Sequence, residues 1–214
     1  MNESKASRRS YSSSARTEAA AETRLRILAA AKALFGQSGI DAVTIAEIAD
    51  KAGVAGSTVY AVFKSKEGIL RDLMQRSLFG DRFQSAQQGL AAIKDPVEAI
   101  ARTSHVARAI YESESSDLGL LRNVSGFSPA LRKIEEEFER TRFEMQAGRL
   151  RRLFRAGKAK HGISLAEARR ILWMYTSRDV YRMLVIDGKW TPGRYEKWLE
   201  QTLVAALVER GESK

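Results

Sequence analysis

The stretch that most constrains the fold runs from residue 44 to residue 66 and reads TIAEIADKAGVAGSTVYAVFKSK. Thr44 and Glu47 have the spacing of a capping box, in which two side chains satisfy free backbone N–H groups at a helix start. Apolar residues then recur at intervals of three and four, and Gly53 follows where a left-handed residue ends many helices. The pattern predicts a short helix that ends in a tight turn.

A second short helix is expected directly after that turn, beginning at Ser57. Val59 and Phe63 would pack it on the first helix, and Ser65 is placed to cap a further one. Two helices joined in this way are typical of a helix-turn-helix, whose second helix enters the major groove of DNA. An ordinary helical hairpin in a larger bundle is the alternative. The capping box, the glycine turn and the basic exit coincide in one short window, which favours DNA binding.

Small residues at the start of the second helix would let its backbone approach a base edge or a phosphate closely. Basic and hydroxyl side chains around it would donate hydrogen bonds to phosphates. The residues expected to contact DNA are Thr44, Ala55, Gly56, Ser57, Thr58, Tyr60, Lys64 and Lys66.

Residues 23–73 resemble the N-terminal domain of TetR-family transcriptional regulators. The matched segments are ILAAAKALF, the Gly39-Ile40 turn, TIAEIADKAGV, STVYAVF and KSKE, in the family's order. Two positions depart from the family pattern, because Ala55 stands where serine is frequent and Val62 where tyrosine or histidine is frequent. Those positions commonly help to cap the second helix and to contact phosphate, so the departures bear on the detailed contacts.

The charge of the chain also favours an acidic partner. The 214 residues have a formal net charge of +10, which points to nucleic acid first and an anionic membrane surface second. There is no cysteine, which suits a reducing cytoplasm. No signal peptide is visible, and the longest apolar stretches are too short and too charged to span a bilayer. A cytoplasmic protein without a membrane partner is expected.

Helix starts in the second half are marked by a capping residue followed by proline, at Pro96, Pro129 and Pro192. Ser164 and Glu167 form a further capping box. No period-two apolar alternation bounded by turns occurs, so no sheet is expected. The predicted fold class is all-α, with about nine helices, an N-terminal three-helix helix-turn-helix domain and a C-terminal helical domain.

Three segments are expected along the chain. Residues 1–20 are rich in Ser, Ala and Arg and predict a disordered basic arm. Its arginines Arg8, Arg9 and Arg16 either reach a neighbouring minor groove or add only diffuse charge. Residues 21–66 would form the DNA-binding domain, and the resemblance implies that residues 67–214 bind an effector and dimerise.

Two C-terminal helices are candidates for a dimer interface. A helix expected over residues 165–187 is apolar on nearly every side at its ends, and the last helix carries an apolar stripe. Both could pair with their copies across a twofold axis, the alternative being burial inside a monomer. The stretch WTPGRYEKWLEQTL also resembles the dimerising last helix of a common TetR subgroup. The predicted interface residues are Trp173, Tyr181, Leu184, Trp198, Leu199 and Leu203.

An effector pocket among the middle helices is implied by the family resemblance. An arginine on an apolar face could hold an anionic ligand group, although such arginines more often reach out to the surface. The candidate lining residues are Phe79, Phe83, Ser104, Arg108, Tyr111, Phe138, Thr141, Arg142 and Met145. The basic run from Arg149 to Lys160 is interpreted as the cationic end of a helix rather than a second nucleic-acid surface.

Motifs for catalysis and metal binding are absent from the sequence, which predicts no enzyme, no metal and no cofactor. The expected function is a homodimeric TetR-like regulator, a repressor that binds a palindromic double-stranded DNA operator and is released by an unknown small-molecule effector. Two alternatives remain open. One is a ligand-blind DNA-binding protein, and the other is a helical small-molecule-binding adaptor that has lost DNA binding.

Overall fold

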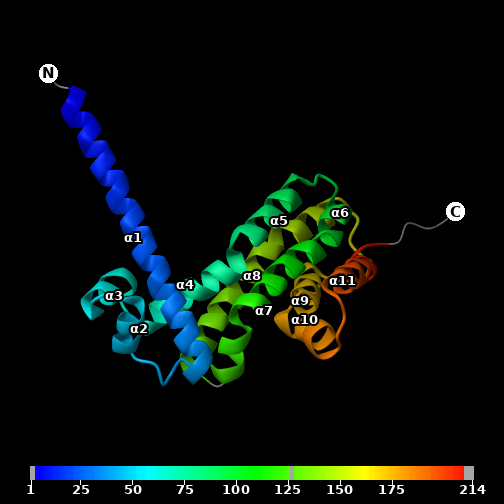
Figure 1. Ribbon diagram of the computed structural model, residues 1–214. Helices are drawn as coiled ribbons and strands as arrows, with labels where there is room; N and C mark the ends of the chain where they lie inside the picture. Colours follow the sequence, from blue (N-terminus) through cyan, green and yellow to red (C-terminus); the bar gives the residue numbers. More distant parts are fainter. Residues whose placement is uncertain (1–2, 126–127, 210–214) are drawn as a thin grey trace. The chain divides into compact units, whose positions relative to one another are not determined.

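The computed structural model of the protein describes residues 3–125 and 128–209, with the side chains of residues 16–114 and 128–209 (Figure 1). Every regular element in this part of the chain is a helix, which confirms the all-α fold class. In order, the elements are α1 (Glu3–Ser38), α2 (Ile45–Ala52), α3 (Gly56–Phe63), α4 (Lys66–Phe79), α5 (Asp81–Ala92), α6 (Pro96–Ala101), α7 (Thr103–Ser125), α8 (Pro129–Arg155), α9 (Leu165–Tyr175), α10 (Arg178–Tyr181), the π-helix η1 (Arg182–Asp187) and α11 (Pro192–Leu207).

The number of helical runs agrees with the sequence. Joining α6 to α7, and α9 to α10 and η1, leaves nine runs among the described residues, as expected from the capping signals. The expected single helix over residues 165–187 is broken after Tyr175. The Thr176 hydroxyl donates to the Leu172 carbonyl, and the Ser177 hydroxyl accepts from the Val180 N–H to cap α10. Hydroxyl side chains therefore compete with the helical ladder at this point.

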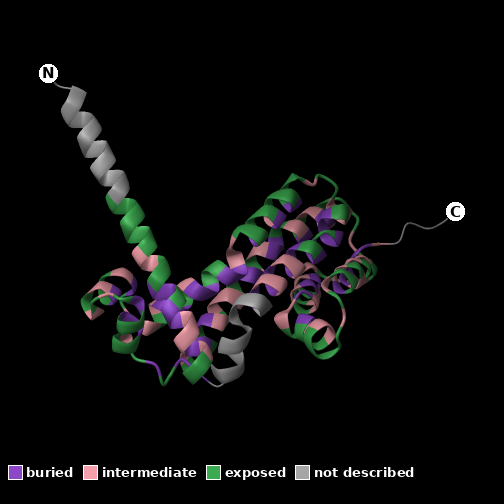
Figure 2. Ribbon diagram, viewed as in Figure 1, coloured by how far each residue is buried: buried purple, intermediate pink, exposed green. Residues whose placement is uncertain are grey.

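The first helix begins earlier than expected. α1 extends back to Glu3, whereas the sequence favoured a disordered arm over residues 1–20. Alanines over residues 19–21 have the highest helix propensity and allow the helix to continue without packing. Figure 2 shows that residues 16–22 are exposed and that burial begins near Ile27. Arg16 is exposed, while the side chains of Arg8 and Arg9 lie outside the described residues.

The chain divides into two compact units. The N-terminal unit comprises Met1–Leu73 with Leu118–Arg132, and the C-terminal unit comprises Met74–Asp117 with Lys133–Lys214. The N-terminal unit thus continues past residue 66, where a boundary was expected, because Ile69, Leu70 and Leu73 of α4 are buried. Its second segment joins the first through the Ser128 hydroxyl, which donates to the Asp41 carboxylate at 3.0 Å.

The core of the N-terminal unit lies where α1, α2, α3 and the start of α4 meet. Ile27, Phe35, Ile48 and Val59 are each fully buried there. Such side chains contribute about 1.5–3 kcal/mol each relative to an exposed position. This burial holds the two short helices α2 and α3, which are too short to be stable alone.

The core of the C-terminal unit is aromatic at its centre. Tyr195 of α11 is fully buried, and its ring lies 4.9 Å from that of Tyr181, which in turn lies 5.7 Å from that of Tyr111. α11 packs on α6 and α9. Among the described residues, no helix is both long and apolar enough to cross a membrane.

Candidate nucleic-acid interface and effector cavity

The start of α2 is held by the capping box that the sequence predicted. The Glu47 N–H donates to the Thr44 hydroxyl at 3.2 Å, and the Thr44 N–H donates to the Glu47 carboxylate at 2.7 Å. The Thr44 hydroxyl also donates to that carboxylate, and these bonds, with the nearby charge of Lys66, lower the pKa of Glu47. Thr44 is exposed, and the hydrogen bonds of its hydroxyl hold the start of α2.

The turn between α2 and α3 depends on Gly53. Its backbone is left-handed, with φ of 64° and ψ of 42°, and its N–H donates to the Asp50 carbonyl. The Val54 N–H then reaches back to the Ala49 carbonyl at 3.0 Å. Added side-chain atoms would meet open space, so glycine is needed here for its conformation and not for its size. The predicted helix end is confirmed.

The start of α3 lacks a side-chain cap. Ala55 occupies the N-cap position with φ of −70° and ψ of 146°, and its methyl group offers no hydrogen bond to the helix. Its carbonyl accepts from the Thr58 N–H at 2.9 Å, which opens α3 at Gly56, one residue earlier than expected. The first N–H groups of α3 thus receive no side-chain acceptor from the capping residue, and they lie at the positive end of the helix dipole.

Most of the residues predicted to contact DNA are accessible. Ser57, Tyr60 and Lys64 are exposed, and Tyr60 stands out because 55% of its surface is exposed. Of the remaining predicted residues, Thr44 and Ala55 are exposed, whereas Gly56, Thr58 and Lys66 are half-buried. The exposed side of α3 therefore presents small, hydroxyl, phenol and ammonium groups together.

Both lysines after α3 make contacts within the protein. Lys64 has φ of 66°, unusual for a residue other than glycine, and its ammonium donates to the Ala61 carbonyl at 3.0 Å. The Lys66 ammonium donates to the carbonyls of Asp41 and Val43 at 3.2 and 2.9 Å. Lys66 thus clamps the loop before α2 to the start of α4, while its predicted role as a phosphate donor stays a prediction.

Sequence reasoning missed an arginine that joins three helices of this unit. Arg24 of α1 pairs with Asp72 of α4 at 3.0 Å, and its guanidinium lies 4.6 Å from the ring centroid of Phe63 in α3. The two charged residues are far apart in the chain, so no local spacing reveals the pair. The ion pair with Asp72 and the cation–π contact with Phe63 together orient α3 relative to α1 and α4.

A second missed requirement is the close approach at Gly68. A Cβ atom added to Gly68 would lie 2.0 Å from the Phe63 carbonyl oxygen, so the first turn of α4 needs glycine to pass the end of α3. The Gly68 N–H donates to the Ser65 hydroxyl at 3.1 Å, which confirms Ser65 as the cap of α4.

The C-terminal unit contains a small internal cavity of about 20 Å³. Four predicted effector residues, Phe79, Phe83, Arg142 and Met145, lie in its wall. The other lining residues are Thr103, Val106, Ala107, Ile110, Gln146, Arg149 and Thr176. A volume of this size holds about one water molecule, so the cavity is closed to a larger ligand in this conformation.

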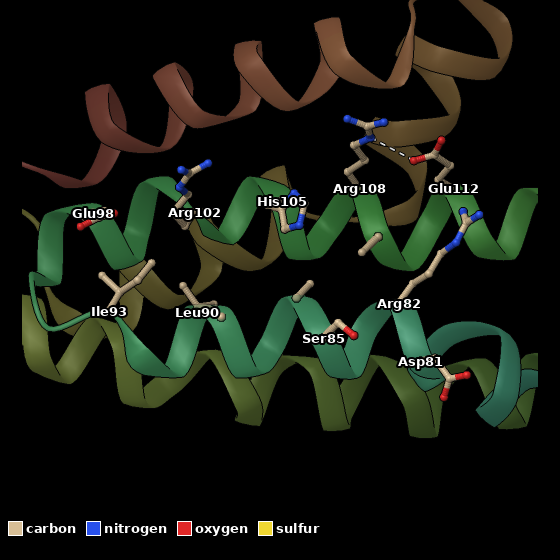
Figure 3. A pocket seen from close by; sticks show the side chains of 13 residues that line it. Asp81, Arg82, Ser85, Leu90, Ile93, Glu98, Arg102, His105, Arg108 and Glu112 are labelled. Carbon is tan, nitrogen blue, oxygen red and sulfur yellow. Dashed lines mark hydrogen bonds and ion pairs between the residues drawn. The ribbon is translucent and has the colours of Figure 1, made fainter.

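A wider groove of about 940 Å³ lies between α5 and the helices α6 and α7 (Figure 3). Arg108 lines this groove and not the cavity. It donates to Glu112 at 2.9 Å and to Glu196 of α11 at 2.9 Å, and His105 also contacts Glu196 at 2.9 Å. Burial raises the pKa of Glu196, but the hydrogen bonds from Arg108 and His105 outweigh it and leave the pKa lowered.

The other predicted pocket residues, Ser104, Tyr111, Phe138 and Thr141, line neither space. Ser104 is buried and donates to the Ala101 carbonyl, and Tyr111 donates to the Thr176 carbonyl at 3.1 Å. Phe138 packs on Phe79 with a ring separation of 5.4 Å, and Thr141 is exposed. Ser104, Tyr111 and Phe138 therefore contribute to core packing in this conformation, while their role in binding an effector stays a prediction.

Arg142 is a buried cation with a full set of partners. Only 6% of its surface is exposed, and its guanidinium pairs with Glu139 and donates to the Trp173 and Thr176 carbonyls. It also donates to the Thr176 hydroxyl at 2.8 Å. The arginine therefore satisfies carbonyls at the C-terminal end of α9, where positive charge is favoured.

The predicted dimer residues divide into two groups. Tyr181, Leu199 and Leu203 are 3%, 0% and 0% exposed within the single chain, so these side chains are buried in its own core. Leu199 and Leu203 lie on α11, which packs on α6 and α9. Trp173, Leu184 and Trp198 are half-buried. The large apolar side chains exposed near them are Met174, Met183 and Ile186, which the prediction omitted.

Metal chemistry receives no support from the geometry. Among the residues that the structure describes, no group of histidine and acidic side chains is arranged to hold a metal ion.

Comparison with known proteins extends these observations. Residues 27–73 match the family model of bacterial regulatory proteins of the tetR family. The chain is 29% identical over 169 residues to YdeS of Bacillus subtilis (strain 168), an uncharacterized HTH-type transcriptional regulator, covering 76% of this chain and 79% of that protein. It is 32% identical over 105 residues to the HTH-type transcriptional repressor KstR2 of Rhodococcus jostii (strain RHA1), covering 44% of this chain and 51% of KstR2, about half the length of that relative.

Solved structures share the fold across nearly the whole chain. NalD, the secondary repressor of the MexAB-OprM multidrug efflux pump in Pseudomonas aeruginosa, superposes with a TM-score of 0.71, covering 91% of this chain and 100% of NalD at 20% identity. The regulator FadR from Bacillus subtilis gives a TM-score of 0.66, covering 85% and 97% at 20% identity. At these identities the likeness concerns the fold alone. Residues 27–73, which match the tetR family model, also contain the helix-turn-helix formed by α2 and α3.

Proposed function

We propose that the protein is a homodimeric repressor that binds a palindromic operator through α3 and is released by a small-molecule effector bound in the C-terminal unit. The observation that carries the proposal is the start of α3, which is exposed, built of small residues and without a side-chain cap. The core beneath it is fully formed by residues of α1, α2 and α4. A short helix presented in this way is suited to enter a major groove.

Phosphate binding follows from the chemistry of that helix end. Backbone N–H groups at a helix N-terminus favour an anion, and Ala55 supplies no competing side-chain oxygen. Tyr60 can donate through its phenol, and the exposed Lys64 uses one ammonium N–H on the Ala61 carbonyl, which leaves two for phosphate oxygens. Ser57 is the exposed hydroxyl placed to read a base edge. Lys66 and Thr44 act indirectly, by holding the start of α2 and the loop before it.

A dimer is proposed because a helix-turn-helix of this kind reads two half-sites about one DNA turn apart. The support comes from the exposed apolar side chains of Met174, Met183 and Ile186 on α9 and η1. Side chains of this size are usually covered when they gather on neighbouring elements. An isologous contact of this surface with its copy would cover them and give the twofold symmetry that a palindrome needs.

An effector is proposed because the C-terminal unit holds a mostly apolar cavity whose lining includes two phenylalanines and a few polar side chains. Solved relatives of similar fold are described as complexes with triclosan, choline and stearoyl-CoA, which differ widely in charge and size. Relationship alone therefore does not identify the effector class. Arg142 and Thr176 line the cavity and also join α8 to the end of α9, so a ligand there would act on the helix that leads into the exposed apolar surface.

The test is selection of bound sequences from random double-stranded DNA with the full-length protein at two salt concentrations. An enriched palindrome bound by two protomers is the expected result, and it would provide the DNA for effector screening. Weak, salt-sensitive binding without an enriched sequence would contradict the proposal and favour the adaptor that has lost DNA binding. An enriched site that no small molecule releases would favour the ligand-blind regulator.

A further inference from the structure

The cavity wall contains a second arginine, Arg149, whose charge is not matched by an acid. Arg149 lies on α8, and its guanidinium donates to the Gln87 amide oxygen of α5 at 3.0 Å. Among the described residues, no carboxylate pairs with it. Burial alone lowers the pKa of Arg149 to about 10, which still leaves it protonated near neutral pH.

The other arginine of the cavity is different, because Arg142 is neutralised by Glu139. Two cations and no acidic side chain line the cavity, and Glu139 is paired with Arg142. The cavity wall therefore carries about one unit of uncompensated positive charge. Keeping the Arg149 guanidinium partly out of water has a desolvation cost. A charge-assisted hydrogen bond to an anionic ligand would offset that cost.

The rest of the wall combines one polar atom without a partner and a set of apolar surfaces. The Gln146 amide oxygen is buried and has no hydrogen-bond donor in the described part of the chain, while its amide nitrogen donates to Thr176. The apolar part of the lining includes Phe79, Phe83 and the unbranched Met145. Met side chains adopt many rotamers, so this wall can give way to a ligand.

The groove outside offers a route to this cavity. Helix α5 presents Phe83 to the cavity and Ser85 and Gly89 to the groove, and α7 likewise has residues in both linings. Figure 3 shows α5 and α7 side by side along the groove, with Arg82 of α5 extending toward α7. A small separation of these two helices would connect the groove to the cavity.

We propose that the effector is an amphipathic anion, with an aromatic or aliphatic body among Phe79, Phe83 and Met145 and a carboxylate or sulfonate on Arg149. This inference rests on the proposed function, since it names the effector class of the same cavity. The anionic group would replace the Gln87 amide as the partner of Arg149, and a donor on the ligand would satisfy Gln146. The solved structures of similar fold do not identify the ligand class. The uncompensated positive charge of the cavity wall is the observation that favours an anion.

The experiment compares two fluorescent probes with the same ring skeleton, 1-anilinonaphthalene-8-sulfonate and the neutral N-phenyl-1-naphthylamine. Both are titrated into the full-length wild-type protein and into Arg149→Met, with Arg151→Met as the matched control because Arg151 is exposed on the same helix. The measured quantity is the ratio of sulfonate affinity to neutral-probe affinity. We expect this ratio to be about tenfold or more higher in the wild type and in Arg151→Met than in Arg149→Met. Neutral-probe affinity should remain in Arg149→Met.

Thermal unfolding of the same variants separates a binding role from a structural one. Replacing an uncompensated cation by an apolar side chain should leave the unfolding temperature of Arg149→Met equal or higher. A lower unfolding temperature, or a sulfonate preference that survives in Arg149→Met, would overturn the inference. Because neither measurement includes DNA, these failures are distinct from failure of the operator selection, which tests the proposed function by itself.

Discussion

Replacing Lys66 by methionine separates its structural role from a role in DNA binding. Methionine keeps an unbranched side chain and removes the ammonium that donates to the Asp41 and Val43 carbonyls. Hydrogen bonds from a charged group contribute about 1.5–3 kcal/mol each when shielded from water. Since one bond is exposed and Lys66 is half-buried, we expect the free energy of unfolding to fall by about 1–2 kcal/mol in total.

The assay is urea unfolding of the full-length protein at one fixed protein concentration, because the proposed dimerisation would make stability depend on concentration. Lys64→Met is the matched variant, since among the described residues its ammonium contacts only the Ala61 carbonyl and its loss should cost about 0.5 kcal/mol or less. On operator DNA, Lys64→Met should lower the salt slope by about 1. If Lys66→Met unfolded at the wild-type urea concentration, the clamp would be refuted.

Four further outcomes are expected. Gly68→Ala should lower the unfolding temperature, because its Cβ would overlap the Phe63 carbonyl. Gly148 faces open space on an exposed helix face, so Gly148→Ala should raise stability by about 0.5–1 kcal/mol. Equal effects of the two substitutions would contradict the packing argument. Tyr60→Phe should weaken binding to all DNA sequences alike, and a changed sequence preference in a repeated selection would count against a phosphate contact. Because the pKa of Glu47 is lowered by folding, its capping box contributes stability above the unfolded pKa that is lost as pH falls through the folded pKa. The gap in urea midpoint between wild type and Glu47→Gln should therefore shrink from neutral pH toward about pH 3, and a constant gap would exclude this linkage. Met183→Glu should shift the protein toward monomer in light scattering, while an unchanged dimer mass would place the interface elsewhere.

The start of α2 shows how much of a helix-turn-helix is visible without a structure. Thr44, Glu47 and Gly53 act on backbone groups within four residues, and each was predicted in its observed role. The prolines and Ser164 marked helix starts for the same reason. Capping and turn conformation depend on local hydrogen bonds and on φ, so they can be read from short stretches.

In the C-terminal unit, the sequence did not determine which element buries each apolar face. Leu199 and Leu203 formed an apolar stripe that suited either a partner or the chain's own core, and only the packing of α11 on α6 and α9 placed them inside. Ser104 and Tyr111 were likewise polar groups on apolar faces, and the structure uses both as core hydrogen-bond donors. Periodicity identifies a buried face but not the element that buries it.

By itself, then, the sequence determined the all-helical class, the helix starts, the turn at Gly53 and the resemblance of the N-terminal domain to the tetR family, because these depend on local backbone chemistry and on one uninterrupted motif. Only the tertiary structure decided that Lys66 clamps a loop, that Arg24 pairs with Asp72, and that Arg142 has a carboxylate partner while Arg149 has none among the described residues. Each of these depends on contacts between residues distant in the chain, where the surroundings set both the partner and the cost of burying a charge.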